Sequence, residues 1–486
     1  MPDEPRRLSP AGIARVADRY RVAMLGVATA VFVATCTLRW RPGNDSAEML
    51  VIARRLNDIG QFRTLGGYHE GVMPGYPWLL ALLGRLGDAV TLAIALNAAA
   101  FVAWVAFVFL WVRAHFDRAT AVVVAGLCAI SARTLEASAD VLPGMLFATL
   151  LAALMWWEAK PRRVALRFVG VGVLLLAMFS LRSVCLLVAA AWLVSGGSSW
   201  LRVQRDNNPP RISWRRGAVL LGVAALSCVG LSLVPALRKD IAALWKDWST
   251  NGLSGIAETM WEALISGVPE AILGIDPTPF AGPLLSILAA MGLVLLFRRC
   301  AFGALVAVTL ALPWFFYLAV PRYVVPVLPM LYLGLWLLVL EMVRRWPGKQ
   351  AGLALAFGLL VVGNLVGVGR FVYEQRQPRF LETYRDGRFA TSRAASDWLA
   401  EHTTRGTRVI CTTREKAVLS FWSGRAVLDT LSTPAVNAGR LLMVEPVDDA
   451  FVEAMAQRGW SASTPMVTFE APEGEPTWTL HEVVRP

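Results

Sequence analysis

The densest group of ionisable side chains in this otherwise apolar chain lies between Gly43 and Pro77. Asp45 and Glu48 are three residues apart at the start of a segment, Ser46–Ile59, whose apolar residues recur at helical spacing. A carboxylate at the start of such a helix could act as a general base and remove a proton from an attacking group. The same spacing fits a capping box, in which both side chains bind free backbone N–H groups of the first turn. The pattern leaves both interpretations open.

His69 and Glu70 precede the proline-rich segment GVMPGYP. Imidazole and carboxylate groups are competent metal ligands, so the pair is a candidate site for a divalent metal or a phosphate. The alternative is an ordinary polar loop closed by prolines.

Further ionisable residues lie in three short turns between apolar runs: Arg133, Glu136 and Asp140 in the first, Arg182 in the second, and Arg322 with its neighbour Tyr323 in the third. A single arginine at the end of a membrane span usually extends to the lipid headgroups. Outer turns normally carry few positive residues, so an arginine in each of three outer turns instead indicates a shared anion. A lipid phosphate fits, because guanidinium binds phosphate in a bidentate manner.

The elements that position these residues are predicted to be membrane helices. The chain has 486 residues, of which 56% are hydrophobic, whereas soluble domains are about 45–50% apolar. Its net charge of +12 comes largely from arginine clusters between apolar runs. That distribution is typical of cytoplasmic loops and not of a nucleic-acid-binding surface, so we expect no nucleic-acid partner. The six cysteines form no CxxC motif and are predicted to be buried apolar residues.

We predict about eleven spans, with the N-terminus in the cytoplasm and the C-terminus outside. The run Phe168–Val194 could be one span with Arg182 at its centre, at a cost of about 2.5–3.5 kcal/mol, or two short spans that meet at Leu181–Ser183. Because both ends of this run are basic, we predict the hairpin. The other spans are expected at about Met24–Leu38, Val90–Trp111, Thr120–Ile130, Val141–Trp157, Ala218–Val234, Leu284–Phe297, Ala304–Ala319, Val325–Val343 and Gly352–Val368.

The predicted domains are a transmembrane domain, residues 1–370, with long outer loops at 39–88 and 236–282, and a soluble domain outside the membrane, residues 371–486. In the second domain the hydrophobic patterns become shorter, as in a small α/β fold. Helices are predicted at Ser392–His402 and Glu415–Trp422, and strands at Thr407–Thr412, Ala426–Asp429, Met466–Phe469 and Thr477–Val484.

Five stretches in order resemble the polytopic GT-C glycosyltransferases, and most of all the bacterial branch related to protein O-mannosyltransferases and lipid A aminoarabinose transferases. These stretches are NDSAEMLVIARRL, PGYPWLLALL, RTLEASADVLPGMLF, FSLRSVCLL and RYVVPVLPML. They are scattered over roughly residues 38–340. The sequence departs from the pattern at Ser46, where many relatives carry a second acidic residue, and at Gly71, where some lipid A enzymes carry a basic one.

The resemblance implies a bacterial plasma-membrane enzyme that transfers a sugar, with inversion, from a polyprenyl-phosphate carrier to a lipid, glycan or protein acceptor at the outer face. Asp45 would be the catalytic base, and Glu48 and Asp140 would be supporting acidic residues. Arg133, Arg182 and Arg322 would bind the carrier phosphate, and we add Tyr323 to this predicted site as the neighbour of Arg322. Glu70 would match the acidic residue before the proline entry, which in relatives lies near the metal or phosphate.

Two other classes of function are compatible with a polytopic chain. A transporter or lipid flippase would need ionisable groups inside spans or paired broken helices, whereas here the charges gather at one predicted face. A binding or scaffold protein would use the membrane part only to display the C-terminal domain.

Overall fold

The structure is a computed structural model of the chain. It describes residues 40–64, 67–68, 72–160, 164–205, 257–316, 321–346, 350–377, 388–404, 406–411, 416–428, 441–445, 459–469 and 477–484, and a few positions between them (249, 252, 254–255, 348, 453 and 455–457). The predicted spans at Met24–Leu38 and Ala218–Val234 lie outside the described residues.

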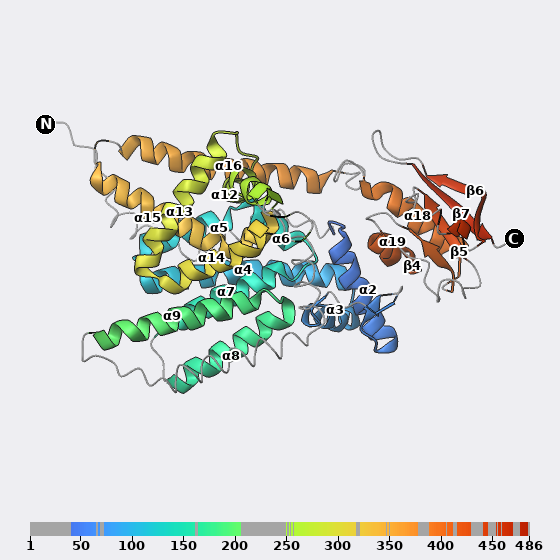
Figure 1. The fold of residues 1–486 in the computed structure, drawn as a ribbon, viewed down its shortest axis with the longest axis horizontal. Coiled ribbons are helices and arrows are strands. Elements are labelled where there is room, and N and C mark those ends of the chain that lie inside the picture. The colour runs from blue at the N-terminus through green and yellow to red at the C-terminus, as the bar shows by residue number, and fades with distance from the viewer. Residues whose placement is uncertain are drawn as a thin grey trace. The chain divides into compact units, whose positions relative to one another are not determined.

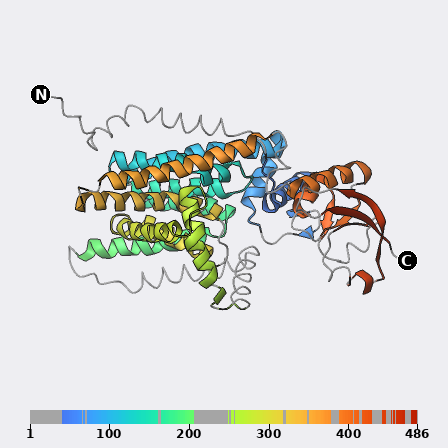
Figure 2. The same ribbon diagram turned by 90° about the horizontal axis from the view of Figure 1, so that it is seen from above.

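Apolar helices make up most of the described chain up to residue 376. They are α4 Ala89–His115, α5 Arg118–Ala129, α6 Ala132–Ala139, α7 Gly144–Ala159, α8 Val164–Leu181, α9 Cys185–Arg205, α12 Val268–Leu273, α13 Ala281–Arg299, α14 Ala301–Phe316, α15 Leu328–Arg345 and α16 Gln350–Arg376. Many of the long helices run alongside one another (Figures 1 and 2). Each span predicted within the described residues coincides with a helix, so the predicted helical bundle is confirmed.

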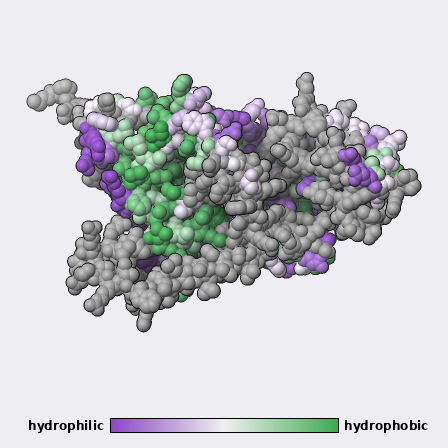
Figure 3. Space-filling view, viewed as in Figure 1, coloured by the Kyte–Doolittle hydropathy of each residue, from purple (hydrophilic) through white to green (hydrophobic). Residues whose placement is uncertain are grey.

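Four helices in the described part are individually long and apolar enough to cross a membrane: Ala89–His115, Ala281–Arg299, Val324–Arg345 and Gln350–Arg376. Helices α5 and α6 pass the same test only together, and they are bent by 53° at the break between them. Exposed apolar residues recur along α16 at helical spacing, and hydrophobic side chains cover a broad area of the bundle surface (Figure 3). Such a surface suits contact with lipid. The number of eleven crossings stays a prediction.

The predicted break near Arg182 is present. Helix α8 ends at Leu181 and α9 begins at Cys185, and the thiol of Cys185 donates to the carbonyl of Leu175 at 3.3 Å. Farther from the turn, the rings of Phe168 and Trp192 are in edge-to-face contact at 5.7 Å. The two helices therefore pack as an antiparallel hairpin.

Helices α13 and α15 approach closely through two glycines. A Cβ atom on Gly292 would lie 2.4 Å from the backbone carbon of Gly334, and one on Gly334 would lie 2.8 Å from that of Gly292. Small residues at a crossing let helix backbones approach and gain van der Waals contact within a membrane.

Two segments predicted as outer loops contain helices. Residues 131–140 include α6, whose Ala132 and Leu135 are buried. Residues 236–282 include the π-helical segment Ala263–Gly267 and α12, whose Val268 and Ile272 are buried. These helices are too short to resemble spans, and tertiary burial rather than length stabilises them.

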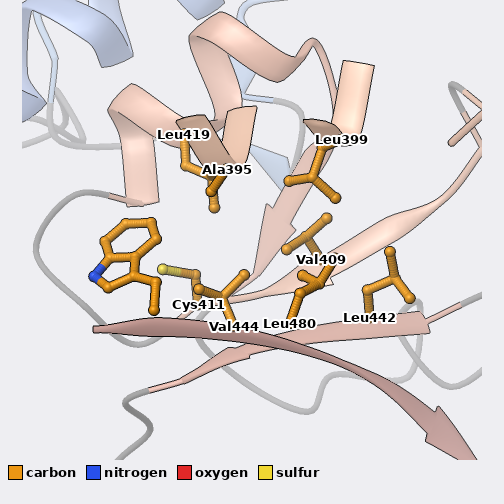
Figure 4. Packing of buried hydrophobic residues seen from close by; sticks show 9 residues of the cluster. Ala395, Leu399, Val409, Cys411, Leu419, Leu442, Val444 and Leu480 are labelled. Atoms are coloured by element: carbon orange, nitrogen blue, oxygen red, sulfur yellow. The ribbon is translucent and has the colours of Figure 1, made fainter. Parts of the chain in front are cut away.

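The C-terminal part forms a five-stranded sheet in the order β4-β3-β5-β7-β6. Strand β3 is parallel to β4 and β5, whereas β7 is antiparallel to β5 and β6. Leu399 of α18 and Leu419 of α19 pack on Val409, Leu442 and other buried residues of the sheet (Figure 4). The elements are α18 Arg388–His402, β3 Arg408–Ile410, α19 Lys416–Ser423, β4 Ala426–Leu428, β5 Leu441–Glu445, β6 Ser461–Phe469 and β7 Trp478–Val484. The predicted small α/β fold is thus confirmed.

By contacts, the chain divides into two compact units. One comprises Leu96–Ser138 and Pro143–Phe371, and the other comprises Thr37–Ala95, Ala139–Leu142 and Val372–Pro486. The first predicted loop therefore groups with the C-terminal segment, although the prediction assigned residues 39–88 to the transmembrane domain. That loop contains α2 Asn44–Ile59, the short strands β1 Arg63–Thr64 and β2 Gly67–Tyr68, and α3 Gly75–Leu86.

Candidate active site

Asp45 lies in the first turn of α2 and is exposed. The helix begins at Asn44 with the extended residue Gly43 as its N-cap, and no side chain caps it. The capping-box interpretation of Asp45 and Glu48 is therefore wrong, because the helix starts two residues earlier than a cap at Asp45 requires. A carboxylate in the first turn interacts favourably with the free N–H groups of the helix.

The buried hydroxyl of Ser46 secures the entry to this helix. Ser46 Oγ donates to the carbonyl of Gly43 at 2.8 Å and accepts from Trp40 Nε1 at 3.2 Å. The Trp40 ring contacts the rings of Phe421 and Trp422 edge to face, at 5.0 and 5.7 Å. Ser46 thus has a structural role at the start of α2.

Helix α2 is held along its length by two neighbouring helices. Ala47 is fully buried in a cluster with Phe389 and Val418, and Arg54 Nη1 donates to the carbonyl of Phe421 at 3.2 Å. Toward α3, the Asn57 amide donates to the carbonyl of Ala81 at 2.7 Å. This packing fixes the direction in which the start of α2 points, as a catalytic side chain requires.

The other two predicted acidic residues belong to the same compact unit as Asp45. Glu48 is half-buried one turn along α2, and so lies on the same side of the helix. Asp140 is half-buried directly after α6, and its carbonyl accepts from the N–H of Leu142 at 2.9 Å. The three carboxylates are thus carried by one unit.

The candidate metal ligands His69 and Glu70 lie outside the described residues. Within the described residues, no group of three or more His, Cys, Asp or Glu side chains could hold a metal ion.

Arg133 is held by two carboxylates from two helices. Its Nη1 donates to Glu136 Oε2 at 2.6 Å, and its Nη2 forms an ion pair with Glu270 of α12. All three side chains are largely buried, with exposed fractions of 19% for Arg133, 28% for Glu136 and 16% for Glu270. Arg133 Nε is buried and has no hydrogen-bond partner within the described residues.

Buried polar groups fix α12, the helix that carries Glu270. The carbonyl of Ile272 accepts from Tyr332 Oη at 3.1 Å and from the Asn364 amide at 2.8 Å. Gly274 then ends the helix at φ 75°, where a Cβ atom would lie 3.0 Å from Asn364 Oδ1. The sequence offers one signal for this cluster, since Asn364 is the only polar side chain in the predicted span Gly352–Val368. Glu270 itself carried no such signal within a long predicted loop.

Arg182 is half-buried in the turn between α8 and α9. Its backbone N–H donates to the carbonyl of Met178 at 3.0 Å, and its carbonyl accepts from the N–H of Cys185 at 3.2 Å. Arg322 and Tyr323 lie in the 3₁₀ helix Pro321–Val327, and their side chains are outside the described residues. The pocket predicted to unite these residues with the carboxylates stays a prediction.

No protein-family model and no curated protein sequence matches the chain. Several solved structures, however, are similar to the chain. The crystal structure of ArnT from Cupriavidus metallidurans bound to undecaprenyl phosphate is similar with a TM-score of 0.58 and 15% identity, over 96% of this chain and 98% of that chain. Its apo state gives a TM-score of 0.59 with the same identity and coverage.

The archaeal oligosaccharyltransferase AglB from Archaeoglobus fulgidus, in complex with an inhibitory peptide and a dolichol-phosphate, is similar with a TM-score of 0.55 and 12% identity. That match covers 85% of this chain and 64% of AglB. At identities this low, the structural matches show a shared fold and no more. They confirm the GT-C fold expected from the five sequence stretches.

Proposed function

We propose that this protein is an inverting glycosyltransferase that moves a sugar from a polyprenyl-phosphate carrier to an acceptor at a membrane surface. The observation that supports this function most is the similarity over 96% of the chain to a structure bound to undecaprenyl phosphate. The dolichol-phosphate in the AglB structure supports the same class of carrier.

In the proposed reaction, a nucleophilic atom of the acceptor forms a bond to the anomeric carbon of the sugar. The bond between that carbon and the phosphate oxygen breaks, and polyprenyl phosphate leaves with the electron pair. Asp45 takes the proton from the acceptor as the new bond forms. Attack opposite the leaving group inverts the anomeric configuration.

Asp45 suits the role of base because it is exposed at the start of a helix that α3 and α19 hold in place. The cations proposed for the leaving phosphate are Arg182 and Arg322, with Tyr323 beside the latter. Positive groups near that oxygen stabilise the charge that develops as the bond breaks. Arg133 enters the proposal as a third cation, although two carboxylates already bind its guanidinium group.

No step of the proposed reaction passes through a metal ion. The described residues contain no group suited to hold one, and His69 and Glu70 remain candidate ligands only by sequence. One structure of the Archaeoglobus fulgidus oligosaccharyltransferase is a complex with Zn and sulfate. We place the enzyme in the bacterial plasma membrane with the C-terminal domain outside, and its acceptor is a lipid, a glycan or a protein.

The test compares Asp45→Asn with Asp58→Asn in solubilised membranes that receive labelled undecaprenyl-phosphate pentoses and hexoses. Asp58 is an exposed aspartate near the other end of the same helix, so it controls for the loss of one surface charge. We expect Asp45→Asn to slow the initial rate of label transfer by about 10²–10⁴-fold, since the acceptor then has no base. Asp58→Asn should transfer at the wild-type rate. Equal rates for wild type and Asp45→Asn would remove Asp45 from the mechanism.

A further inference from the structure

A cavity of about 370 Å³ lies where α4, α7 and α13 end and where α8 and α14 begin. Bulky apolar side chains form part of its wall, among them Trp111, Met155, Trp192 and Phe297. Its charged lining residues are Glu158, Arg167, Arg298 and Arg299. The predicted topology places these helix ends on the cytoplasmic side. Arg167 and Arg182 occupy opposite ends of α8, about 22 Å apart at 1.5 Å per residue, so the cavity is remote from the predicted outer turn.

One of the three arginines in the cavity is neutralised. Arg167 Nε donates to Glu158 Oε1 at 3.1 Å and to Oε2 at 3.0 Å. The Glu158 side chain is only 8% exposed, whereas that of Arg167 is 44% exposed. The Glu158 carboxylate in the cavity wall is therefore fully paired with Arg167, and the two side chains together carry no net charge.

The other two arginines keep their positive charge. Arg298 and Arg299 are exposed in the last turn of α13, and neither forms an ion pair within the described residues. Arg299 is within electrostatic range of Glu341, but Arg345 already binds that carboxylate at 2.8 Å. The cavity thus carries, beside its aromatic side chains, two guanidinium groups that have no ion-pair partner in the described part of the chain.

A further hydrogen-bond donor lines the same cavity. Trp192 Nε1 is buried and has no hydrogen-bond partner within the described residues. A buried donor without a partner costs free energy unless a ligand oxygen or a water accepts from it. Trp111 Nε1, in the same lining, is likewise buried without a partner in the described part of the chain, so the candidate donors are two guanidinium groups and two indole N–H groups. Among the described lining residues the one carboxylate, that of Glu158, is bound by Arg167.

We propose that this cavity binds the phosphate group of an anionic membrane lipid, at a site separate from the transfer reaction. Guanidinium groups bind phosphate oxygens with strong charge-assisted hydrogen bonds. Basic pockets between membrane helices on the cytoplasmic side are suited to lipid headgroups, and the aromatic wall suits the glycerol and first methylenes of the lipid. A volume of 370 Å³ is in the range of small-ligand sites.

The experiment titrates the purified full-length protein with dioleoyl phosphatidylglycerol in detergent and counts bound lipid by native mass spectrometry. Dioleoyl phosphatidylcholine, with the same acyl chains and no net charge, is the lipid control. We expect the double variant Arg298→Gln, Arg299→Gln to weaken phosphatidylglycerol binding by about tenfold or more, because two charge-assisted contacts are lost. The matched control Arg344→Gln, Arg345→Gln removes two exposed arginines from the end of neighbouring α15 and should bind as the wild type does.

A second variant keeps the charges and fills the space. Ala301 lines the cavity, so Ala301→Phe should also weaken binding, while its thermal unfolding temperature reports whether the fold is kept. Asp45→Asn should bind phosphatidylglycerol normally, which separates this site from the proposed reaction. Equal loss in both double variants, equal binding of the two lipids, or unchanged binding in Ala301→Phe would overturn the proposal. Displacement of the lipid by millimolar inorganic phosphate would assign the cavity to a soluble phosphate compound instead.

Discussion

Arg133 shows how one side chain can join two helices of the bundle. Its guanidinium group binds Glu136 on its own helix and Glu270 on α12. Two carboxylates and one cation leave a net negative charge in a place where all three side chains are largely buried. Such an arrangement depends strongly on the central cation, because without it both carboxylates lose their partner.

Replacement of Arg133 by Gln is therefore expected to destabilise the fold, by about 2 kcal/mol in the free energy of unfolding. The measurement is the midpoint of thermal unfolding in detergent, followed by tryptophan fluorescence. Arg345→Gln breaks an exposed pair with Glu341 in which the arginine side chain is 69% exposed, and it should leave the midpoint unchanged. A normal midpoint in Arg133→Gln, together with a raised KM for the lipid-linked sugar, would instead show that Arg133 serves the substrate.

Local residue patterns predicted the helix that carries Asp45 but did not predict the ion pair between Arg133 and Glu270. The helix that carries Asp45 was predictable because its apolar residues and the stop at Gly60 are all local. The pairing of Arg133 with Glu270 was not, because the partners are far apart in the sequence and meet only through tertiary packing. The start of α2 was misplaced for a related reason, since Ser46 and Trp40, rather than a cap at Asp45, organise it.

Helix α19 of the C-terminal segment stabilises the position of α2. Ala47 and Val418, both fully buried, share a cluster in which Trp40 contacts the rings of Phe421 and Trp422. The C-terminal segment is therefore structural support for the helix that carries the proposed base, in addition to any contact with an acceptor.

A charge introduced into this cluster should impair the proposed active site, although the substituted residue is not part of that site. We expect Val418→Asp to lower the free energy of unfolding by about 3 kcal/mol and to slow transfer, because an unpaired carboxylate is buried between α19 and α2. Val484→Asp makes the same change at a residue of the same sheet domain that is 42% exposed, and it should be nearly neutral. Thermal unfolding and initial rates report the two effects. Wild-type rates in Val418→Asp would show that α19 does not support the site.

Helices and strands were predicted correctly where the local pattern of charge or hydrophobicity identifies them. The break between α8 and α9 was predicted because both ends of the run Phe168–Val194 are basic, which requires an even number of crossings. Strands β3, β4, β6 and β7 were expected from their patterns, whereas β5, Leu441–Glu445, was not. Residues 441–444 are all buried, so this central strand lacks the alternation that identifies a strand.

The whole molecule combines a unit of apolar helices with a unit that joins the first loop to the C-terminal sheet domain. Such a union across the chain cannot be read from local composition, because it depends on contacts between segments separated by hundreds of residues. It also constrains topology. Because α2 and the C-terminal domain pack as one unit, both must lie on the same side of the membrane. The predicted topology agrees, since it has an even number of spans between α2 and the tail.

Single-cysteine variants test that topology in a background without the six native cysteines. Glu401 is exposed in α18, and Lys160 is exposed at the end of α7 beside the basic segment expected in the cytoplasm. We expect a membrane-impermeant maleimide to label Glu401→Cys in intact spheroplasts and Lys160→Cys only after lysis, because positive clusters are retained in the cytoplasm. Labelling in the reverse order would place Asp45 inside the cell, where the proposed outer-face reaction could not occur. Labelling of both in intact spheroplasts would contradict the predicted number of crossings between α7 and α18.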